Sequence, residues 1–449
     1  MKSSVPKVVH PLAGLPIIEH VVRTTIEVGA ATTTVVVGHG ADAVRAALTS
    51  HPQLDFVVQS PQLGTGHALL QAQPILEHQS GTVLLLYGDV PLLRAGTLRR
   101  LLEHHRAAGA SLTVLTALLD DAYGYGRIVR DAGGRIARIV EERDASAEEH
   151  AIREINSGIY AIELSGLFDA LHGLATDNAQ GEYYLTDLVA NWYRQRRVVE
   201  TLCIDDPVEL RGINTRVDLA DLSRVQLDRT RRGHMLQGVT LEDPDSTWIE
   251  SDVTIGEDTV IAPGVTLTGR TSIGQRCHIR SGTRITDSVV GDEVTVLDHS
   301  VIVQSTIAAG SAVGPMAHLR PGSELGAGAR VGNFVELKKA TLGPGSKANH
   351  LAYLGDATIG DHVNIGAGVI TCNYDGTNKH QTTIEDGVFV GSDSQLIAPV
   401  TIGSGAYVAA GSTITHDVPP GSLGLSRTPQ INKEGWAARN AARKKDKVR

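Results

Sequence analysis

Aliphatic residues recur at every sixth position through a long stretch of the C-terminal half, and this period constrains the fold more than any other feature of the chain. One series consists of Ile255, Ile261, Leu267, Ile273, Ile279 and Ile285, and a second of Val313, Leu319, Leu325, Val331 and Leu337. Six is a multiple of the two-residue period of a strand and fits the 3.6-residue period of a helix poorly. The pattern therefore predicts short strands that each bury one aliphatic side chain.

Glycine is concentrated in the same region. The 449 residues include 48 glycines but only four Phe and three Trp, and 26 of the glycines lie between residues 249 and 426. Many directly follow the aliphatic residue, as in Ile255-Gly256 and Ile365-Gly366. A hexapeptide-repeat parallel β-helix explains both features, because three short faces make one coil of about 18 residues and the coils stack their aliphatic rows. We expect the glycines at corners where other side chains would be strained.

Two further observations bear on this fold. An ordinary β-sandwich with irregular strands would not keep a six-residue period over so many repeats. The polar segment TCNYDGTNKHQTT, residues 371–383, interrupts the period and cannot fill a buried row. We expect it to protrude as a loop.

The N-terminal part alternates short apolar segments with helix-like ones, which predicts an α/β layer structure with a largely parallel sheet. The strand-like segments are residues 34–37, 56–58, 83–87 and 112–117, and the helix-like segments are 17–28, 41–48, 68–76 and 97–108. Residues 217–236 resemble one amphipathic helix that joins the two halves. The predicted organisation is an N-terminal domain over 1–216, a linker helix over 217–237, a β-helix over 238–426 and a tail over 427–449.

Charge and cysteine content exclude several classes of protein. Lys and Arg number 41 against 50 Asp and Glu, so a net charge of −9 gives no general attraction for nucleic acid or anionic membranes. The three cysteines are far apart and odd in number, which argues against a disulfide framework and a clustered zinc site and fits a reducing cytoplasm. No apolar run reaches the roughly 20 residues that span a bilayer. We expect a cytoplasmic protein with neither nucleic-acid nor membrane partners.

Two segments of the N-terminal half can bind a ligand. Gly88-Asp89-Val90-Pro91 follows an apolar strand, so Asp89 lies at the strand's carboxyl end, where open α/β sheets bind ligands. With a second oxygen ligand, this carboxylate can hold Mg²⁺, although an Asp in this position is more often a helix N-cap. The segment LGTGHA, residues 63–68, opens a helix whose N–H groups can face an anion or a base edge, with an ordinary tight turn as the alternative.

Polar residues are dense between positions 320 and 374 of the repeat region. They are Arg320, Lys338, Lys339, His350, Tyr353, Asn364, Asn373 and Tyr374. A solvated outer face is the simplest interpretation, but the residue types also suit a sugar phosphate, since Arg and Lys neutralise phosphate and Asn and Tyr bond hydroxyls. Acyl transfer to an amine needs a base near neutral pH, and His350 is the candidate.

The order of several motifs resembles one bacterial family over nearly the whole chain. The motifs are PKVVH from Pro6, Gln59 with LGTGHA, LYGDVPL from Leu86, GYGRI from Gly124, EINSGIY from Glu154, GEYYLTD from Gly181 and GINTR from Gly212, followed by the hexapeptide region. They resemble the bifunctional N-acetylglucosamine-1-phosphate uridyltransferases/glucosamine-1-phosphate acetyltransferases. The resemblance implies an α/β Rossmann-like nucleotidyltransferase domain and a left-handed parallel β-helix.

The resemblance also implies two reactions in the synthesis of cell-envelope precursors. The C-terminal domain would transfer acetyl from acetyl-CoA to glucosamine 1-phosphate. The N-terminal domain, with Mg²⁺, would then join N-acetylglucosamine 1-phosphate to the α-phosphate of UTP and release pyrophosphate. A homotrimer is expected, in which neighbouring subunits complete each acetyltransferase site.

The same resemblance implies a role for each matching residue. In the N-terminal domain, Lys7 would contact phosphate, and the uracil would be held by Gln59, Gly64 and Thr65. The sugar would be contacted by Tyr87, Gly126, Glu141 and Asn156. Mg²⁺ would be bound by Asp89 and Asn214. In the C-terminal domain, His350 would be the base, and Arg320, Lys338, Tyr353 and Asn364 would bind glucosamine 1-phosphate. Asn373 and Tyr374 would contact the acetyl donor. Coenzyme A would be bound by Ala367, Ser392, Ala410 and Arg427, and Lys379 would reach a neighbouring subunit.

One departure from the family concerns the start of the chain. Its members begin with a strand and a glycine-rich loop, LAAGxGTRM, that cradles the triphosphate, and this sequence starts at the Met of that motif. Without the loop, the preorganised electrostatics of phosphoryl transfer are lost, and without the strand its neighbours keep unpaired backbone groups. We expect either a mis-assigned start codon or an inactive first domain, which would leave only the acetyltransferase. A non-catalytic sugar-nucleotide-binding or assembly protein is a third alternative.

Overall fold

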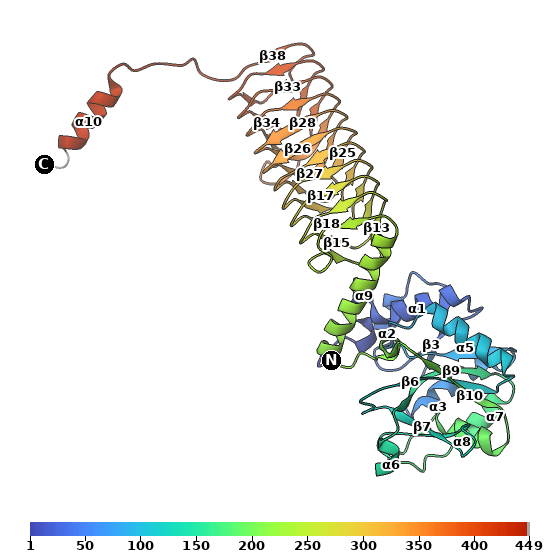
Figure 1. The fold of residues 1–449 in the computed structure, drawn as a ribbon. Coiled ribbons are helices and arrows are strands. Elements are labelled where there is room, and N and C mark those ends of the chain that lie inside the picture. Colours follow the sequence, from blue (N-terminus) through green and yellow to red (C-terminus); the bar gives the residue numbers. More distant parts are fainter. Residues whose placement is uncertain (447–449) are drawn as a thin grey trace. The chain divides into compact units, whose positions relative to one another are not determined.

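The computed structural model describes residues 1–446, which form two compact units with a boundary between Gln226 and Leu227 (Figure 1). Helix α9 (Arg216–Leu236) spans that boundary, over nearly the range predicted for a linker helix. Unit 1 contains α/β structure and unit 2 contains stacked short strands. Within the described residues, none of the helices combines the length and the apolar character needed to cross a membrane.

The main sheet of unit 1 has six strands and mixed pairing. The strands are β5 (Thr82–Leu85), β6 (Leu112–Leu118), β7 (Gly126–Arg130), β8 (Ile136–Val140), β9 (Glu154–Glu163) and β10 (Val199–Ile204). Their order is β10-β6-β9-β7-β8, and β5 also pairs with β9. Strand β9 is antiparallel to β5, β6 and β7, whereas β10 and β6 are parallel. The prediction of a largely parallel sheet is therefore wrong, because β9 lies between β5 and β6 and runs against both.

Strands β3 (Thr34–Val37) and β4 (Asp55–Val58) form a separate parallel two-stranded sheet. The described strands pair β3 with β4 alone and β5 with β9 alone. The described strands therefore leave the two sheets of unit 1 separate.

The helices of unit 1, with the exception of α6, each bury part of their surface against the rest of the unit. They are α1 (Ile17–Val28), α2 (Ala41–Ala47), α3 (Thr65–Leu70), α4 (Gln73–Leu76), α5 (Ala95–Ala107), α6 (Ala147–His150), α7 (Leu167–His172) and α8 (Asp187–Arg194). The segment predicted as one helix over 68–76 is two short helices, α3 and α4. In α1 the residues of the first two turns are buried, and Gly29 ends the helix in the left-handed conformation (φ 83°).

Unit 2 is a parallel β-helix built from strands of mostly two or three residues, from β11 (Thr240–Leu241) to β38 (Leu423–Gly424). One face of the coil forms an 11-stranded sheet, and the other two faces contribute to a 17-stranded sheet (Figure 1). Every aliphatic residue of the two predicted series is buried, and the most exposed of them, Ile255, is only 8% exposed. The predicted β-helix is confirmed.

The length of a coil changes between the two hexapeptide series. Ile255 pairs with Ile273, and Leu319 with Leu337, so each of these coils is made of three complete hexapeptides. Ile273 instead pairs with Val290, so that coil is shorter by a single residue. One corner has lost a residue there, and the six-residue period read from the sequence is therefore interrupted after Ile285 although the buried row continues.

Glycine follows the buried aliphatic residue because the next coil approaches its backbone. A Cβ atom on Gly256 would lie 2.7 Å from the backbone nitrogen of Gln275, and one on Gly366 would lie 2.5 Å from that of Ser392. Neither glycine has a positive φ, whereas non-glycine residues such as Asp258 (φ 59°) do at the corners. The expected reason, strain at the corner, is therefore wrong for these positions, and close backbone approach replaces it.

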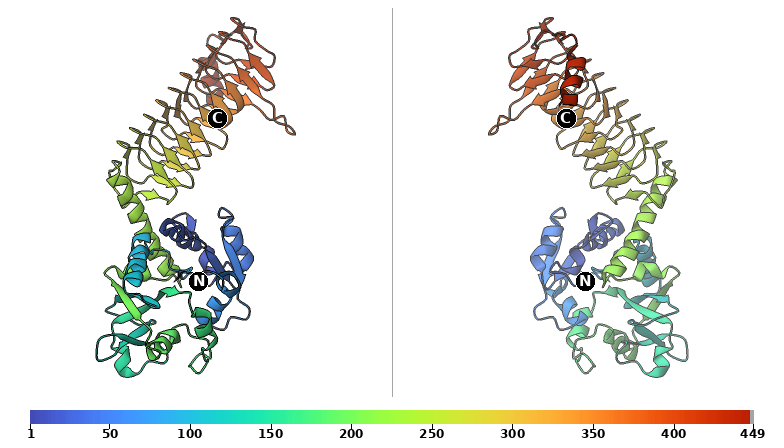
Figure 2. Two further views of the ribbon diagram at one scale, coloured as in Figure 1. Left: turned by 90° about the vertical axis from the view of Figure 1, so that its right-hand side faces the viewer. Right: turned by 90° about the vertical axis from the view of Figure 1, so that its left-hand side faces the viewer.

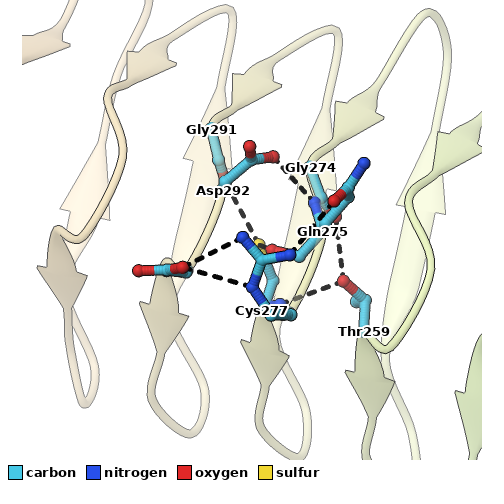
Figure 3. A network of polar contacts seen from close by, with 8 residues as sticks. Thr259, Gly274, Gln275, Cys277, Gly291 and Asp292 are labelled. Atoms are coloured by element: carbon cyan, nitrogen blue, oxygen red, sulfur yellow. Dashed lines mark hydrogen bonds and ion pairs between the residues drawn. The ribbon is translucent and has the colours of Figure 1, made fainter.

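Side-chain hydrogen bonds also tie successive coils together (Figure 3). The Thr259 hydroxyl donates to the carbonyl of Gly274 (2.8 Å) and accepts from the N–H of Cys277 (3.0 Å), and Asp292 accepts from the N–H of Gln275 (2.8 Å). Cys277 is fully buried, and burial raises the pKa of its thiol. All three cysteines are free. Cys277 therefore serves packing rather than chemistry.

The predicted protruding loop is present between β31 (Ile370–Cys372) and β32 (Thr382–Ile384), where it projects from the coils (Figure 2). Asp375 organises it by accepting from the N–H groups of Thr377 (2.8 Å) and Asn378 (2.6 Å) and from the His380 ring (2.8 Å). These bonds hold the pKa of Asp375 well below its usual range. Beyond the coils, the tail contains helix α10 (Trp436–Asp446).

We expect Ile302→Ala to lower the free energy of unfolding of unit 2 by about 2–5 kcal/mol, because it leaves a cavity in the fully buried aliphatic row. Val289→Ala is the matched control: Val289 is 52% exposed, and a change of about 0.5 kcal/mol or less is expected. Chemical denaturation followed by circular dichroism measures both. Equal losses in the two variants would contradict the assignment of Ile302 to the core.

Candidate active sites

The first cluster in unit 1 joins Lys7, Asp89 and Asn214. The Nζ atom of Lys7 lies 2.5 Å from Oδ2 of Asp89 and 2.9 Å from Oδ1 of Asn214. The N–H of Ile213 donates to the Asp89 carbonyl (3.0 Å), which holds the Asn214 loop beside the end of β5. The structure thus brings together the two residues predicted to bind Mg²⁺ and the lysine predicted to bind phosphate.

This cluster suits a hard cation. The carboxylate of Asp89 and the amide oxygen of Asn214 both contact the positively charged ammonium group of Lys7. Carboxylate and amide oxygens are also the kind of ligand that Mg²⁺ prefers. Within residues 1–446, no cluster of three or more His, Cys, Asp or Glu side chains could hold a metal by itself. A bound Mg²⁺ would therefore keep positions for phosphate oxygens and water, as is usual for this ion.

The second cluster contains Gly126, Glu141 and Asn156. Gly126 on β7 pairs with Asn156 on β9, and a Cβ atom on Gly126 would lie 3.4 Å from Oε2 of Glu141. Oδ1 of Asn156 accepts from the N–H of Gly158 and the hydroxyl of Tyr160, both at 3.0 Å. These bonds leave the amide NH₂ of Asn156 to donate to a ligand. Burial raises the pKa of Glu141 above its usual value.

Tyr87 lies between these two clusters. Its ring covers Gly158, where a Cβ atom would overlap it. Burial, followed by the charges of Glu141 and Asp89, raises the pKa of Tyr87 to about 12. The phenol is therefore neutral at physiological pH, and its hydroxyl can donate a hydrogen bond next to two carboxylates.

The third cluster is the segment around Gly64, which is fixed to the GEYY segment. The N–H of Gly66 donates to the carbonyl of Tyr183 and the N–H of Tyr183 donates to that of Leu63, both at 2.9 Å. Gly64 has a φ of 103°, and a Cβ atom there would lie 2.8 Å from the Tyr183 carbonyl oxygen. Nε2 of Gln59 donates to the Gly64 carbonyl (3.0 Å).

Unit 1 also contains a cavity of about 760 Å³, whose lining includes none of the residues of the first two clusters. Its lining includes Gln59, Thr65 and Tyr87. Two residues predicted to hold uracil and one predicted to contact the sugar therefore face one space, which is of the size that small-molecule sites usually have.

In unit 2, His350 lies at the end of β28 (Lys347–His350), beside Asn333 at the end of β26 (Arg330–Asn333). The Nδ1 atom of His350 lies 2.8 Å from Oδ1 of Asn333. Because the amide oxygen can only accept, Nδ1 carries the proton and Nε2 keeps a free lone pair. That tautomer suits a base whose reacting nitrogen is Nε2.

Cationic groups gather on the neighbouring coils. Arg320 donates to Glu336 (2.8 Å) on β27 (Glu336–Leu342), and Glu336 pairs with Tyr353 on β29 (Tyr353–Ile359). A side-chain hydrogen bond with Lys338, and then the positive charge of Lys338, lower the pKa of Lys379, so the two amino groups lie close together. Lys379 thus lies beside Lys338 of its own chain. Two adjacent cations suit a phosphate.

The remaining predicted residues of unit 2 have different surroundings. Asn373 is buried and donates to Asp356, while Tyr374 is exposed on the protruding loop and donates to the carbonyl of Gly376 (2.5 Å). Asn364 belongs to the 11-stranded sheet, on β30 (Asn364–Ile365), where it pairs with Lys347 of β28. Of these residues, Asn364 is the one that shares the sheet of His350.

The residues predicted to bind coenzyme A form a column along the coils. The N–H of Asp393 donates to the carbonyl of Ala367 (2.7 Å), and the N–H of Gly411 to that of Ser392 (2.8 Å), so each small residue lies beside the next coil. Arg427 donates to the carbonyl of Ala410 (2.8 Å). A line of small side chains that ends at a guanidinium matches an elongated ligand with a phosphate at one end.

Several residues in these sites had no individual role in the sequence-based prediction. Thr186 donates to Glu141 (3.1 Å), Glu336 accepts from Arg320, and Asn333 contacts His350. Thr186 belongs to the GEYYLTD motif, so its motif was a usable signal. Asn333 and Glu336 lie one coil before His350 and Tyr353, and the spacing of the repeat would have found both.

Comparisons with known proteins match both units. Residues 1–147 match a MobA-like NTP transferase domain, residues 248–344 a GMPPB C-terminal domain, and residues 381–416 six repeats of a bacterial transferase hexapeptide. Curated relatives cover nearly the whole chain. The "Bifunctional protein GlmU" of Trichlorobacter lovleyi is 52% identical over 97% of this chain and 95% of its own length. The protein of the same name from Pelobacter propionicus is 51% identical over 98% of this chain and 95% of its own length. The one from Brevibacillus brevis is also 51% identical, over 97% of this chain and 94% of its own length.

The chain belongs to the GlmU family. As a GlmU protein it combines a nucleotidyltransferase unit with a hexapeptide acyltransferase unit, and the fold class and family expected from the sequence are confirmed. The GlmU relatives match across both units, so the likeness belongs to the whole chain and not to one half of it.

We expect Gly64→Ala to destabilise unit 1 by about 1–3 kcal/mol more than Gly81→Ala, because only the former drives a methyl group against a neighbouring backbone. Both glycines have a strongly positive φ, 103° and 111°, but nothing lies within 4 Å of a Cβ atom on Gly81. Thermal unfolding of the two variants isolates the steric contact. Equal losses would mean that backbone strain alone, and not the contact with Tyr183, requires glycine at position 64.

Proposed function

We propose that this chain catalyses two steps of UDP-N-acetylglucosamine synthesis: acetylation of glucosamine 1-phosphate in unit 2 and uridylyl transfer to N-acetylglucosamine 1-phosphate in unit 1. The observation that carries the proposal is the pairing of His350 with Asn333 on the coils that also carry Arg320 and Lys338. Membership of the GlmU family and the three clusters of unit 1 support the second activity. The proposed enzyme is cytoplasmic and homotrimeric.

In the acetyl transfer, His350 takes a proton from the 2-amino group of glucosamine 1-phosphate. The amine nitrogen then forms a bond to the thioester carbonyl carbon of acetyl-CoA, the carbon–sulfur bond breaks, and coenzyme A leaves as the thiol after protonation. Asn333 holds His350 in the tautomer that leaves Nε2 free, and a positioned general base contributes about 10²–10⁴-fold to such a step. Arg320, Lys338, Tyr353 and Asn364 bind the sugar phosphate.

The acetyl donor occupies the column of small residues. Ala367, Ser392 and Ala410 leave room for the pantetheine arm along the coils, and Arg427 binds a phosphate of coenzyme A. Asn373 and Tyr374 contact the acetyl end from the protruding loop. Lys379 adds a positive charge near Lys338 and, in a trimer, reaches towards the neighbouring subunit.

In the uridylyl transfer, a phosphate oxygen of N-acetylglucosamine 1-phosphate attacks the α-phosphate of UTP and pyrophosphate leaves. Mg²⁺, when bound by Asp89 and Asn214, supplies charge neutralisation at the phosphate oxygens. Lys7 binds phosphate and offsets developing charge. Gln59, Gly64 and Thr65 orient the uracil, while Tyr87, Gly126, Glu141 and Asn156 orient the sugar.

We expect His350→Ala to lower the rate of acetyl transfer by about 10²-fold or more and to leave UTP-dependent pyrophosphate release unchanged. Release of free coenzyme A thiol measures the first reaction. Asn333→Ala should lower kcat with little change in KM and should alter the pH profile, because the tautomer of His350 is no longer fixed. Full acetyl transfer by His350→Ala would refute the assignment of the base.

We expect Asp89→Asn to weaken Mg²⁺-dependent binding of UTP by about tenfold or more, because the hard cation loses its charged ligand. Calorimetry with UTP in the presence and absence of Mg²⁺ measures this without relying on turnover. Asp206→Asn, whose carboxylate pairs with Arg94 rather than Lys7, is the matched control. Equal Mg²⁺ dependence in wild type and Asp89→Asn would exclude Asp89 as a ligand.

A second candidate function is acetyl transfer alone. The observation that favours it is the separation of the β3–β4 sheet from β5, which leaves the predicted nucleotide site beside two unjoined sheets. Parallel assays of both reactions distinguish the candidates, using the 449-residue chain and a version extended by a family-type LAAGxGTR segment. Pyrophosphate release by the 449-residue chain supports the bifunctional enzyme, whereas release by the extended version alone supports the second candidate.

A further inference from the structure

Asp356 lies among the proposed acetyltransferase residues of unit 2 but has no part in the reaction described above. It belongs to β29, at a corner where its backbone takes the left-handed conformation (φ 46°). Tyr353, a proposed ligand of the sugar phosphate, is in the same strand, and the residue before Asp356 pairs with Lys338 of β27. A carboxylate in this place repels a phosphate, so we looked for the group that it binds instead.

That group is the side-chain amide of Asn373, one coil later. Nδ2 of Asn373 donates to Oδ2 of Asp356, and Asn373 is only 7% exposed. Because a carboxylate oxygen can only accept, the NH₂ group of Asn373 is the side of the amide that faces Asp356. The amide oxygen, Oδ1, therefore points away from the carboxylate, and none of the described residues donates to it.

Backbone hydrogen bonds hold Asn373 at the base of the protruding loop. Its N–H donates to the carbonyl of Thr371 (2.9 Å), and its carbonyl accepts from the N–H of His380 (2.8 Å). The Thr371 hydroxyl accepts from the N–H of Gly355 (2.8 Å) and donates to the carbonyl of Gly355 (2.9 Å). The backbone is thus fixed on both sides of the contact, and the bond to Asp356 decides how the Asn373 amide is turned.

The carboxylate of Asp356 also lies near the cations of the site. A hydrogen bond with Lys338 and the charge of Lys338 lower the pKa of Lys379, and the negative charge of Asp356 partly opposes this lowering. Lys379 forms a backbone bridge with Tyr374, the residue after Asn373. Asp356 therefore lies within electrostatic reach of the groups proposed to bind phosphate and holds the end of the loop that carries them.

We propose that Asp356 is a positioning residue for acetyl transfer, whose carboxylate turns the amide oxygen of Asn373 towards an N–H group of a substrate. The inference rests on the proposed acetyl transfer. Two substrate groups have the required chemistry: the 2-amino group of glucosamine 1-phosphate and the amide of the pantetheine arm nearest the thioester. The thioester carbonyl oxygen does not suit Oδ1 of Asn373, because both atoms only accept.

Asp356→Gly tests the inference without straining the corner, because glycine adopts the left-handed conformation freely and Gly322 (φ 78°) occupies the same corner two coils earlier. We expect kcat/KM for acetyl transfer to fall about tenfold or more, since a hydrogen bond to a charged group is lost. A higher KM for glucosamine 1-phosphate alone identifies the amine as the partner of Asn373, and a higher KM for acetyl-CoA alone identifies the pantetheine amide.

Asp258→Gly is the matched control, because it removes a carboxylate from another left-handed corner of unit 2 (φ 59°). It should leave both KM values and kcat within about twofold of the wild type. Thermal unfolding of both variants verifies that unit 2 still folds.

A double variant checks that Asp356 acts through Asn373. Asn373→Ala and the double variant Asp356→Gly/Asn373→Ala should lose the same activity, because the carboxylate then has no amide to orient. Additive losses would mean that Asp356 acts on another group, such as Lys379, and would overturn the inference. Wild-type kinetics in Asp356→Gly, or equal rises in both KM values, would overturn it as well. An inactive wild-type chain would instead contradict the proposed function itself.

Discussion

The close approach of successive coils in unit 2 is the constraint on which the rest of that unit depends. The backbone after each buried aliphatic residue lies so near the next coil that a methyl group does not fit at Gly256 or Gly366. The same approach brings the aliphatic rows into contact and forms parallel hydrogen bonds between coils. A core built this way needs few aromatic residues, which is why a chain with four Phe and three Trp can still bury a continuous interior.

The stacking also decides where the chemical groups lie. Residues at equivalent positions of successive coils fall next to one another, so Asn333 meets His350 and Glu336 meets Tyr353. Ser392 and Ala410 of the predicted coenzyme A column are also one coil apart, and they too lie next to one another. The repeat thus supplies both the rigid support and the spacing of the proposed acetyltransferase site.

Unit 1 obtains its sites in a different way. Its clusters come from segments far apart in the sequence, such as Lys7 with Asp89 and Asn214, or Gly64 with Tyr183. Backbone hydrogen bonds between loops fix the first and third clusters, whereas the pairing of β7 with β9 places Gly126 beside Asn156 in the second. Glycine is required at position 64, where the loop touches the backbone of Tyr183. The cavity beside them is lined by β3 and by β5, each of which pairs with a single strand among those that the structure describes.

The sequence by itself determined the β-helix, its buried row, the protruding loop and the family, because a six-residue period and ordered motifs are local signals that need no tertiary information. It also named the residues that meet at Asp89 and at Gly126, through motif resemblance. Only the tertiary structure decided the mixed sheet, since strand β9 is placed between β5 and β6 by long-range pairing that no local pattern encodes. The tertiary structure also decided why glycine follows the aliphatic residues and which partners hold Glu141 and His350, because such contacts depend on backbone distances between segments that the sequence does not contain.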